Sequence, residues 1–136
     1  MQLRKECFVA VVIAATVGFS NMASAAEFSF SFEWGNIPGC NSGYPNVVSN
    51  PIFTFANVPN GTKKLNMHMQ DLNVSYDHGG GVITYTGENV IQPGAFEYSS
   101  PCPPDGVHTY EWQAKALDAG GGVIGTAKAT KDYDGW

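Results

Sequence analysis

The longest run of alternating apolar and polar residues in this sequence is His108-Thr109-Tyr110-Glu111-Trp112-Gln113-Ala114-Lys115-Ala116. Successive side chains of a β-strand point to opposite faces, so this period of two predicts a strand with one buried and one exposed face. Shorter stretches of the same kind predict further strands within residues 28–34, 53–55, 65–71 and 82–85. The pattern from Val123 to Tyr133 fits either a strand or a short helix.

Glycine and proline separate these stretches, notably in the runs Gly79-Gly80-Gly81 and Gly120-Gly121-Gly122. No long periodicity of 3.6 residues, which would indicate a helix, appears in the sequence. Several short strands separated by turns predict an all-β chain, a β-sandwich with few or no helices.

The first 25 residues have the pattern of a secretory signal peptide. Arg4 and Lys5 precede an uncharged run at residues 8–19, and a small-residue cleavage motif ends at Ala25. A run of twelve residues is too short for a transmembrane helix, which needs about 20. We therefore expect a signal peptide at 1–25, one domain at 26–136, no transmembrane segment, and a periplasmic or secreted protein cleaved near Ala25.

Charge excludes two classes of partner. Residues 26–136 contain five lysines and eleven aspartates or glutamates, and they lack any basic cluster. Nucleic acids and anionic membranes are both bound through clustered Lys or Arg. We therefore expect no nucleic-acid partner.

Two cysteines, Cys40 and Cys102, remain after Cys7 leaves with the signal peptide. In an oxidising compartment two thiols most often pair, so a disulfide is predicted, with two free thiols or half of a metal site as alternatives. No Cys-x-x-Cys pair or Cys/His cluster has metal-ligand spacing, so we expect no metal and no cofactor. The disulfide would tether a long Gly- and Pro-rich loop at residues 35–50.

Polar residues interrupt the apolar face of two predicted strands. Asp71 follows Leu65, Met67 and Met69 on one face, and His108 and Tyr110 begin the apolar face of the longest strand. An unpaired buried carboxylate is costly, so these inward groups predict a polar pocket at one end of the sandwich. Simpler roles remain open: Asp71 as a turn cap, His108 as a structural histidine, and Tyr110 as a core aromatic.

The loop before this strand runs from Tyr98 to Val107 and contains Pro101, Pro103 and Pro104. Each proline fixes its φ angle, so the loop is rigid and loses little entropy when a ligand binds. It is either the preformed wall of a ligand site or a structural turn held by Cys102.

The segment Pro101-Cys102-Pro103-Pro104-x-Gly106-x-His108-x-Tyr110, followed by Ala116-Leu117-Asp118, resembles the C-terminal signature of the phosphatidylethanolamine-binding protein (PEBP) family, especially its bacterial Raf-kinase-inhibitor-like branch. The upstream segment Asn50-Pro51-x-Phe53-x-Phe55-x-Asn57-Val58-Pro59-x-Gly61-Thr62 is similar to that family's first conserved block. The chain looks like a short, divergent member. After Asp71 it lacks the family's second acid and the proline, and no His-Trp pair follows.

The resemblance implies a β-sandwich with a small anion pocket at one end. The candidate ligand-binding residues that follow from it are Asp71, His108, Tyr110, Pro103 and Pro104, with Tyr98 at the start of the loop. His78 either replaces the missing pocket histidine or lies in a turn.

The expected function is that of an exported binding protein for a small anionic, phosphate-ester or phospholipid-headgroup-like ligand. The alternative is a protein-interaction or inhibitor module that acts on an exported enzyme. A hydrolase is less favoured and no catalytic residue is assigned, because Ser99 and Ser100 lie outside any Gly-x-Ser-x-Gly motif.

Overall fold

The structure is a computed structural model that describes residues 12–18, 26–40 and 44–134. The basic start of the predicted signal peptide, its cleavage motif and Cys7 lie outside the described residues. The described secondary structure is entirely β. Its strands are β1 (Ser29–Glu33), β2 (Val47–Ser49), β3 (Ile52–Ala56), β4 (Lys64–Asp71), β5 (Asp77–Thr84), β6 (Val90–Ile91), β7 (Glu97–Ser99), β8 (His108–Leu117) and β9 (Val123–Tyr133). In this part of the chain, no helix has the length and apolar character needed to cross a bilayer.

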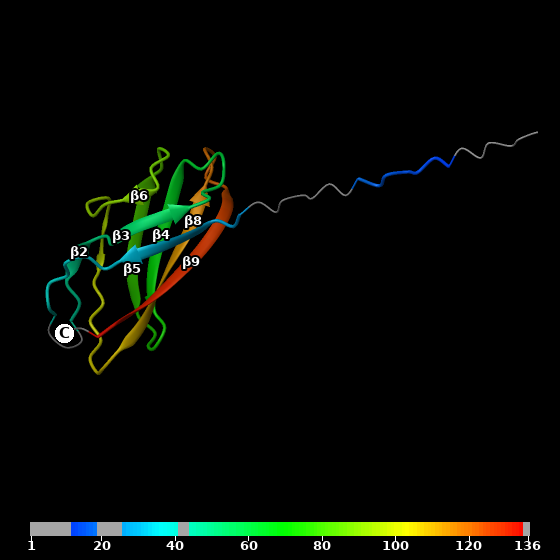
Figure 1. Cartoon of the computed structure of the whole chain (residues 1–136). Coiled ribbons are helices and arrows are strands. Elements are labelled where there is room, and N and C mark those ends of the chain that lie inside the picture. Colours follow the sequence, from blue (N-terminus) through cyan, green and yellow to red (C-terminus); the bar gives the residue numbers. More distant parts are fainter. Residues whose placement is uncertain (1–11, 19–25, 41–43, 135–136) are drawn as a thin grey trace, which may run out of the picture.

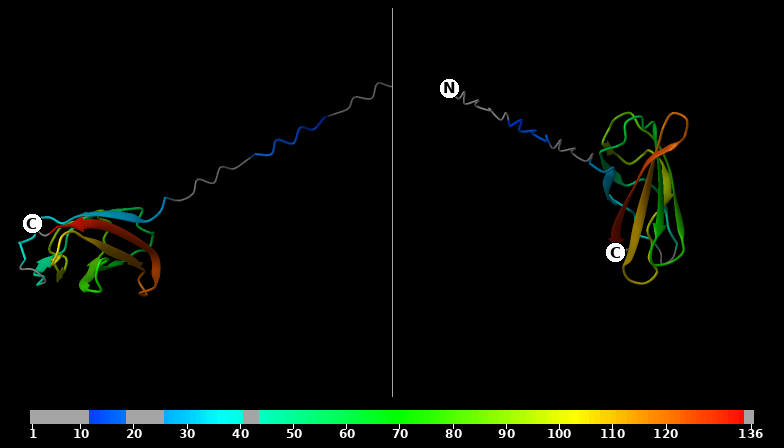
Figure 2. Two further views of the ribbon diagram at one scale, coloured as in Figure 1. Left: turned by 90° about the horizontal axis from the view of Figure 1, so that it is seen from below. Right: turned by 90° about the vertical axis from the view of Figure 1, so that its right-hand side faces the viewer.

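The strands form two main antiparallel sheets (Figures 1 and 2). One has the order β1-β3-β6 and the other β5-β4-β8-β9, while β2 and β7 form a small third sheet. Aromatic side chains of the two main sheets meet in the core, where the Phe53 and Trp112 rings pack edge to face at 5.2 Å. The predicted all-β sandwich is confirmed.

Alternation along β4 and β8 matches the predicted parity. Leu65, Met67, Met69 and Asp71 of β4 are buried, as are His108, Tyr110, Trp112, Ala114 and Ala116 of β8, whereas His68 is exposed. The antiparallel register pairs Leu65 with Ala116 and Asp71 with Tyr110. The acid and the phenol are therefore neighbours on adjacent strands.

The glycine run 79–81 lies inside β5, where the sequence had predicted a strand only from residue 82. A Cβ on Gly80 would lie 1.9 Å from the Met67 carbonyl oxygen, and one on Gly81 would lie 2.5 Å from the Phe96 side chain. These glycines permit close packing of β5 on its neighbours rather than marking a turn.

The C-terminal segment, which the sequence left undecided, is the eleven-residue strand β9 at one edge of the four-stranded sheet. β2, β6 and β7 were not predicted, because two or three residues are too few to show a period.

The predicted disulfide is present between Cys40 and Cys102, with the Cα atoms 6.0 Å apart. It ties the loop before β2 to the proline loop before β8. Closing a loop of this length stabilises the fold by about 4 kcal/mol in the chain-entropy model.

Candidate functional site

A cavity of about 150 Å³ lies at the end of the sandwich where β4 ends and β8 begins. Four predicted site residues line it: Asp71, His78, Tyr110 and Pro104. The remaining lining residues are Pro45, Val74, Tyr76 and Cys102. The β4–β8 register, the start of β5 and the disulfide-tethered loops bring these groups together.

Asp71 forms a buried pair with His108. His108 Nδ1 lies 2.6 Å from Asp71 Oδ2, and only 6% and 4% of the two side chains is exposed. The other carboxylate oxygen accepts hydrogen bonds from the backbone N–H groups of Asn73 and Val74. Asp71 is thus both the turn cap and the partner of the histidine.

The pair is ionic. Burial acts to raise the pKa of Asp71, but the hydrogen bond and charge of His108, together with the two backbone N–H groups, lower it overall. The hydrogen bond to Asp71 raises the pKa of His108 against the opposing effect of burial. Asp105 Oδ1 lies 3.4 Å from the other ring nitrogen, so both nitrogens of His108 face carboxylates. His108 therefore binds Asp71 without lining the cavity itself.

Tyr110 brings an unused hydrogen-bonding group to the cavity. Its side chain is fully buried, and its hydroxyl makes no well-formed hydrogen bond among the described residues, although the Asp71 carboxylate and the Cys102 backbone lie near it. Burial and the charge of Asp71 raise its pKa, so the phenol remains protonated. The hydroxyl therefore has hydrogen-bond donor capacity that the fold leaves largely unused.

His78 lies beside Tyr110, with the two rings edge to face at 5.3 Å. Its Nδ1 donates to the Ser99 carbonyl at 2.8 Å, which fixes the tautomer and leaves Nε2 with a lone pair when the ring is neutral. Burial lowers the pKa of His78 despite that hydrogen bond and the charge of Asp71. The cavity thus combines one donor, one titratable ring nitrogen and one carboxylate.

The other predicted site residues lie outside the lining. Pro103 is buried beside the cavity, and Tyr98 packs in the core with its ring 5.0 Å from that of Trp112. The ligand-binding role of all these residues remains a prediction. Pro45, Val74 and Tyr76 were missed because they lie in irregular segments, where alternation carries no signal.

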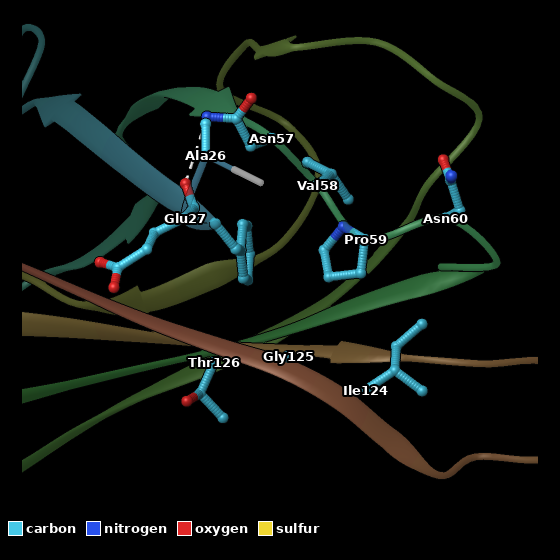
Figure 3. Close-up of a pocket in the computed structure, with 10 residues that line it drawn as sticks. Ala26, Glu27, Asn57, Val58, Pro59, Asn60, Ile124, Gly125 and Thr126 are labelled. Carbon is cyan, nitrogen blue, oxygen red and sulfur yellow. Dashed lines mark hydrogen bonds between the residues drawn. The ribbon is translucent and has the colours of Figure 1, made fainter. Parts of the chain in front are cut away.

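A second hollow, a shallow groove of about 700 Å³, lies at the opposite end of the sandwich between the starts of β1 and β9 (Figure 3). Its lining comes from three segments, residues 26–28, 57–60 and 124–126, and Glu27 is the one ionisable side chain among them. Asn57 Nδ2 donates to the Glu27 carbonyl across it. Nowhere in the described ranges do three or more His, Cys, Asp or Glu side chains gather as a metal site would require. Of these two hollows, the cavity at the β4–β8 end therefore contains more acid–base groups.

These features define an all-β sandwich with a small pocket at one end that combines polar and apolar side chains and is bordered by a disulfide-tethered proline loop. Two solved structures share its fold. One is a putative PEBP homologue, CT736 from Chlamydia trachomatis, which is 18% identical with a TM-score of 0.59; the match covers 79% of this chain and 97% of that one. The other is E. coli YbcL, described as a new member of the mammalian PEBP family, also 18% identical with a TM-score of 0.55 over 80% of this chain and 99% of that one.

At this identity the likeness establishes the fold, and the predicted PEBP-like architecture is confirmed. No protein-family model matches the sequence, and no curated protein matches it.

Proposed function

We propose that this chain is an exported binding protein whose end pocket accepts a small phosphate-ester or phospholipid-headgroup-like group, without catalysing a reaction. The observation that carries the proposal is the buried hydroxyl of Tyr110, a cavity-lining residue, which makes no well-formed hydrogen bond among the described residues. Buried polar groups are nearly always hydrogen-bonded, and leaving one unsatisfied costs free energy of folding. A ligand oxygen would complete this one. The fold shared with two PEBP-titled structures is consistent with a binding protein.

His78 supplies the second contact. Its Nε2 accepts a proton from a singly protonated phosphate ester or, when the ring is protonated, donates to the dianion. Either way one proton is shared between ring and ligand, and the second ionisation of a phosphate ester lies near pH 6. Affinity should therefore rise as the pH falls from 8 towards about 6.

Asp71 sets the charge of the preferred ligand. It is the one charged side chain in the lining, and it would repel a dianion. The His108 imidazolium compensates this charge in part, and a ligand amine placed near Asp71 would do so further. The site should therefore prefer a zwitterionic phosphate ester, such as phosphoethanolamine, over a simple monoester.

Export is supported by the N-terminal pattern and by the Cys40–Cys102 disulfide, since disulfides persist in oxidising compartments. Sequencing of the protein from periplasm or culture medium should give an N-terminus at Ala26. A chain that retains Met1 there would contradict this part of the proposal.

The binding test compares two buried tyrosines that both lack a hydroxyl partner. Tyr110 lines the cavity and Tyr98 does not, so Tyr98→Phe is the matched control for Tyr110→Phe. In phosphorus NMR titrations with phosphoethanolamine, Tyr110→Phe should weaken binding about tenfold, as expected for one hydrogen bond to a charged group. Tyr98→Phe should leave binding unchanged. Equal effects of the two variants, or no binding between pH 5 and 7, would refute the proposal.

A second candidate function is a protein-interaction module, favoured by apolar side chains exposed in the two loops that contribute residues to the cavity. Leu72, Val74 and Tyr76 of the β4–β5 loop are 45–49% exposed, and Val107 of the proline loop is 56% exposed. Exposed apolar clusters often mark protein contacts. Loss of a protein partner in Leu72→Ser and Val107→Ser, with phosphoethanolamine binding intact, would favour this function, because neither residue lines the cavity.

A further inference from the structure

Three of the eight described residues that line the end cavity are aromatic: Tyr76, His78 and Tyr110. The His78 ring packs against both tyrosines, with its centroid 4.5 Å from that of Tyr76 and 5.3 Å from that of Tyr110. The ring planes are inclined by 64° and 83°. Rings inclined in this way, unlike a parallel stack, can border one small group from several sides. Because the face of an aromatic ring is electron-rich, such a lining suits a cation.

The charge beside this lining is negative. Among the described residues that line the cavity, Asp71 is the one carboxylate and none is a lysine or arginine. Burial lowers the pKa of His78, so its ring is neutral near pH 7 and does not repel a cation. The His108 imidazolium that pairs with Asp71 also has the Asp105 carboxylate 3.4 Å from its other ring nitrogen. Two carboxylates around one imidazolium leave a net negative charge, which attracts a cation.

The Asp71 carboxylate supplies this charge with few free hydrogen-bonding positions. One oxygen binds His108 Nδ1, and the other accepts from the backbone N–H groups of Asn73 and Val74. Three of the roughly four lone-pair sites of a carboxylate are thus occupied. The remaining lining side chains that are neither charged nor aromatic have no oxygen or nitrogen atom; they are Pro45, Val74, Cys102 and Pro104.

This shortage of acceptors distinguishes between kinds of ammonium group. The Tyr110 hydroxyl and His78 Nε2 are assigned above to the phosphate oxygens of the ligand. A primary ammonium would therefore give up water at three N–H donors and recover few acceptors, which is costly in a buried site. A fully methylated ammonium has no N–H group to satisfy, and its methyl groups match the apolar part of the lining.

We propose that the ligand of this cavity carries a methylated ammonium group, which lies against the aromatic rings near the Asp71 carboxylate. This inference rests on the proposed binding function and makes it more specific, since phosphocholine should bind more tightly than phosphoethanolamine. Aromatic side chains recognise quaternary ammonium groups in this way in general. The same group occurs on soluble zwitterions and on lipid headgroups, and the cavity would recognise the chemistry that they share.

The first experiment compares phosphate esters at pH 7 by phosphorus NMR. Phosphocholine should bind about tenfold more tightly than phosphoethanolamine. The uncharged analogue of phosphocholine, in which a tert-butyl group replaces the trimethylammonium, should bind more weakly than phosphocholine because it lacks the positive charge. If phosphocholine binds no more tightly than either of the other two, the inference is overturned, while the proposed function stands as long as phosphoethanolamine binds.

The second experiment uses tetramethylammonium, which carries no phosphate. Its methyl proton resonance should move upfield when the protein is added, because ring currents shield groups that lie over aromatic faces. This result does not depend on phosphate binding, so the inference and the proposed function can fail separately. A resonance that does not move at near-millimolar protein concentration overturns the inference.

Phosphatidylcholine vesicles distinguish the two sources of the group. A protein that takes the lipid headgroup should sediment with the vesicles and be released by phosphocholine. A protein that takes only the soluble ligand should stay in the supernatant and still bind phosphocholine. Sedimentation that phosphocholine does not reverse would place the contact outside the cavity and would count against the inference.

The last experiment removes one ring. Tyr76 is 45% exposed, so its replacement should leave the fold intact. Tyr76→Leu should weaken the binding of tetramethylammonium and of phosphocholine by roughly 3- to 10-fold, whereas Tyr76→Phe, which keeps the ring, should bind as the wild type does. Tyr44→Leu is the matched control, because Tyr44 is 78% exposed and does not line the cavity. A loss for Tyr76→Leu no larger than that for Tyr76→Phe or Tyr44→Leu overturns the inference.

Discussion

Asn50 and Asp71 are both buried polar residues, but their surroundings differ. Asn50 Nδ2 donates to the carbonyls of Pro51 and Gln92, and its Oδ1 accepts from the backbone N–H groups of residues 94–96. Every polar atom of that side chain is used inside the fold. Asp71 is equally well bonded, but beside it lie a cavity, the unpartnered Tyr110 hydroxyl and the titratable ring of His78. A buried side chain whose polar atoms all have hydrogen-bond partners within the fold indicates a structural role. Polar atoms without such partners beside a cavity indicate a binding role.

The largest effect should come from Asn50→Ala. The substitution leaves several backbone groups of the segment 92–96 without partners in a buried position. We expect a loss of about 3 kcal/mol in the free energy of unfolding, measured with urea, and no change in the affinity of the folded protein for phosphoethanolamine. Asn66→Ala, at an exposed position on β4, is the control and should be nearly neutral. A small loss for Asn50→Ala would contradict its structural role.

The next effect compares two His–Asp pairs with the same N–O distance of 2.6 Å. His108–Asp71 is buried, whereas His68–Asp77 lies exposed on the outer face of the sheet. His108→Ala leaves Asp71 with two backbone hydrogen bonds but no counter-charge, and should lower stability by about 2 kcal/mol near pH 6. His68→Ala should have no measurable effect, because exposed pairs contribute little. Equal losses from the two variants would show that burial does not distinguish the pairs.

The sequence predicted well which face of its strand each site residue occupies. It did not predict which residues of other strands lie next to it. Alternation in β4 and β8 placed Asp71, His108 and Tyr110 inward, and the structure agrees. The pairing of Asp71 with Tyr110, however, depends on the β4–β8 register, which arises from long-range packing and not from either strand alone. The pattern within one strand likewise could not show that His108 binds Asp71 instead of lining the cavity.

Where the glycines lie explains the main error in the fold prediction. The run 79–81 resembles a turn in sequence, yet it is strand because β5 packs against the Met67 carbonyl and Phe96 too closely for any side chain. This contact carries β5 back to Asp77 and brings His78 to the cavity. Tyr76 and Pro45 reach the same cavity from irregular segments, whose course depends on the disulfide and on neighbouring loops.

The smallest expected effect is a pH dependence carried by the Asp71–His108 pair. The pKa of Asp71 is lowered in the folded protein, so its contribution is present above the unfolded value of about 3.9 and is lost as the pH falls through the folded pKa. The pKa of His108 is raised, so its contribution is complete below about 6.5 and is lost as the pH rises through the folded pKa. The stabilising effect of the pair is therefore greatest near pH 5.

Urea unfolding of the wild type and Asp71→Asn at pH 5 and pH 9 measures this effect. Both proteins retain His78, whose lowered pKa gives the opposite trend, and the difference between them removes most of that contribution. The nearby groups Asp105 and Tyr110 are also common to both. The destabilisation caused by Asp71→Asn should be larger at pH 5 than at pH 9. If it is the same at both pH values, the two groups do not form an ion pair, and Asp71 acts at this end of the sandwich only as a turn cap.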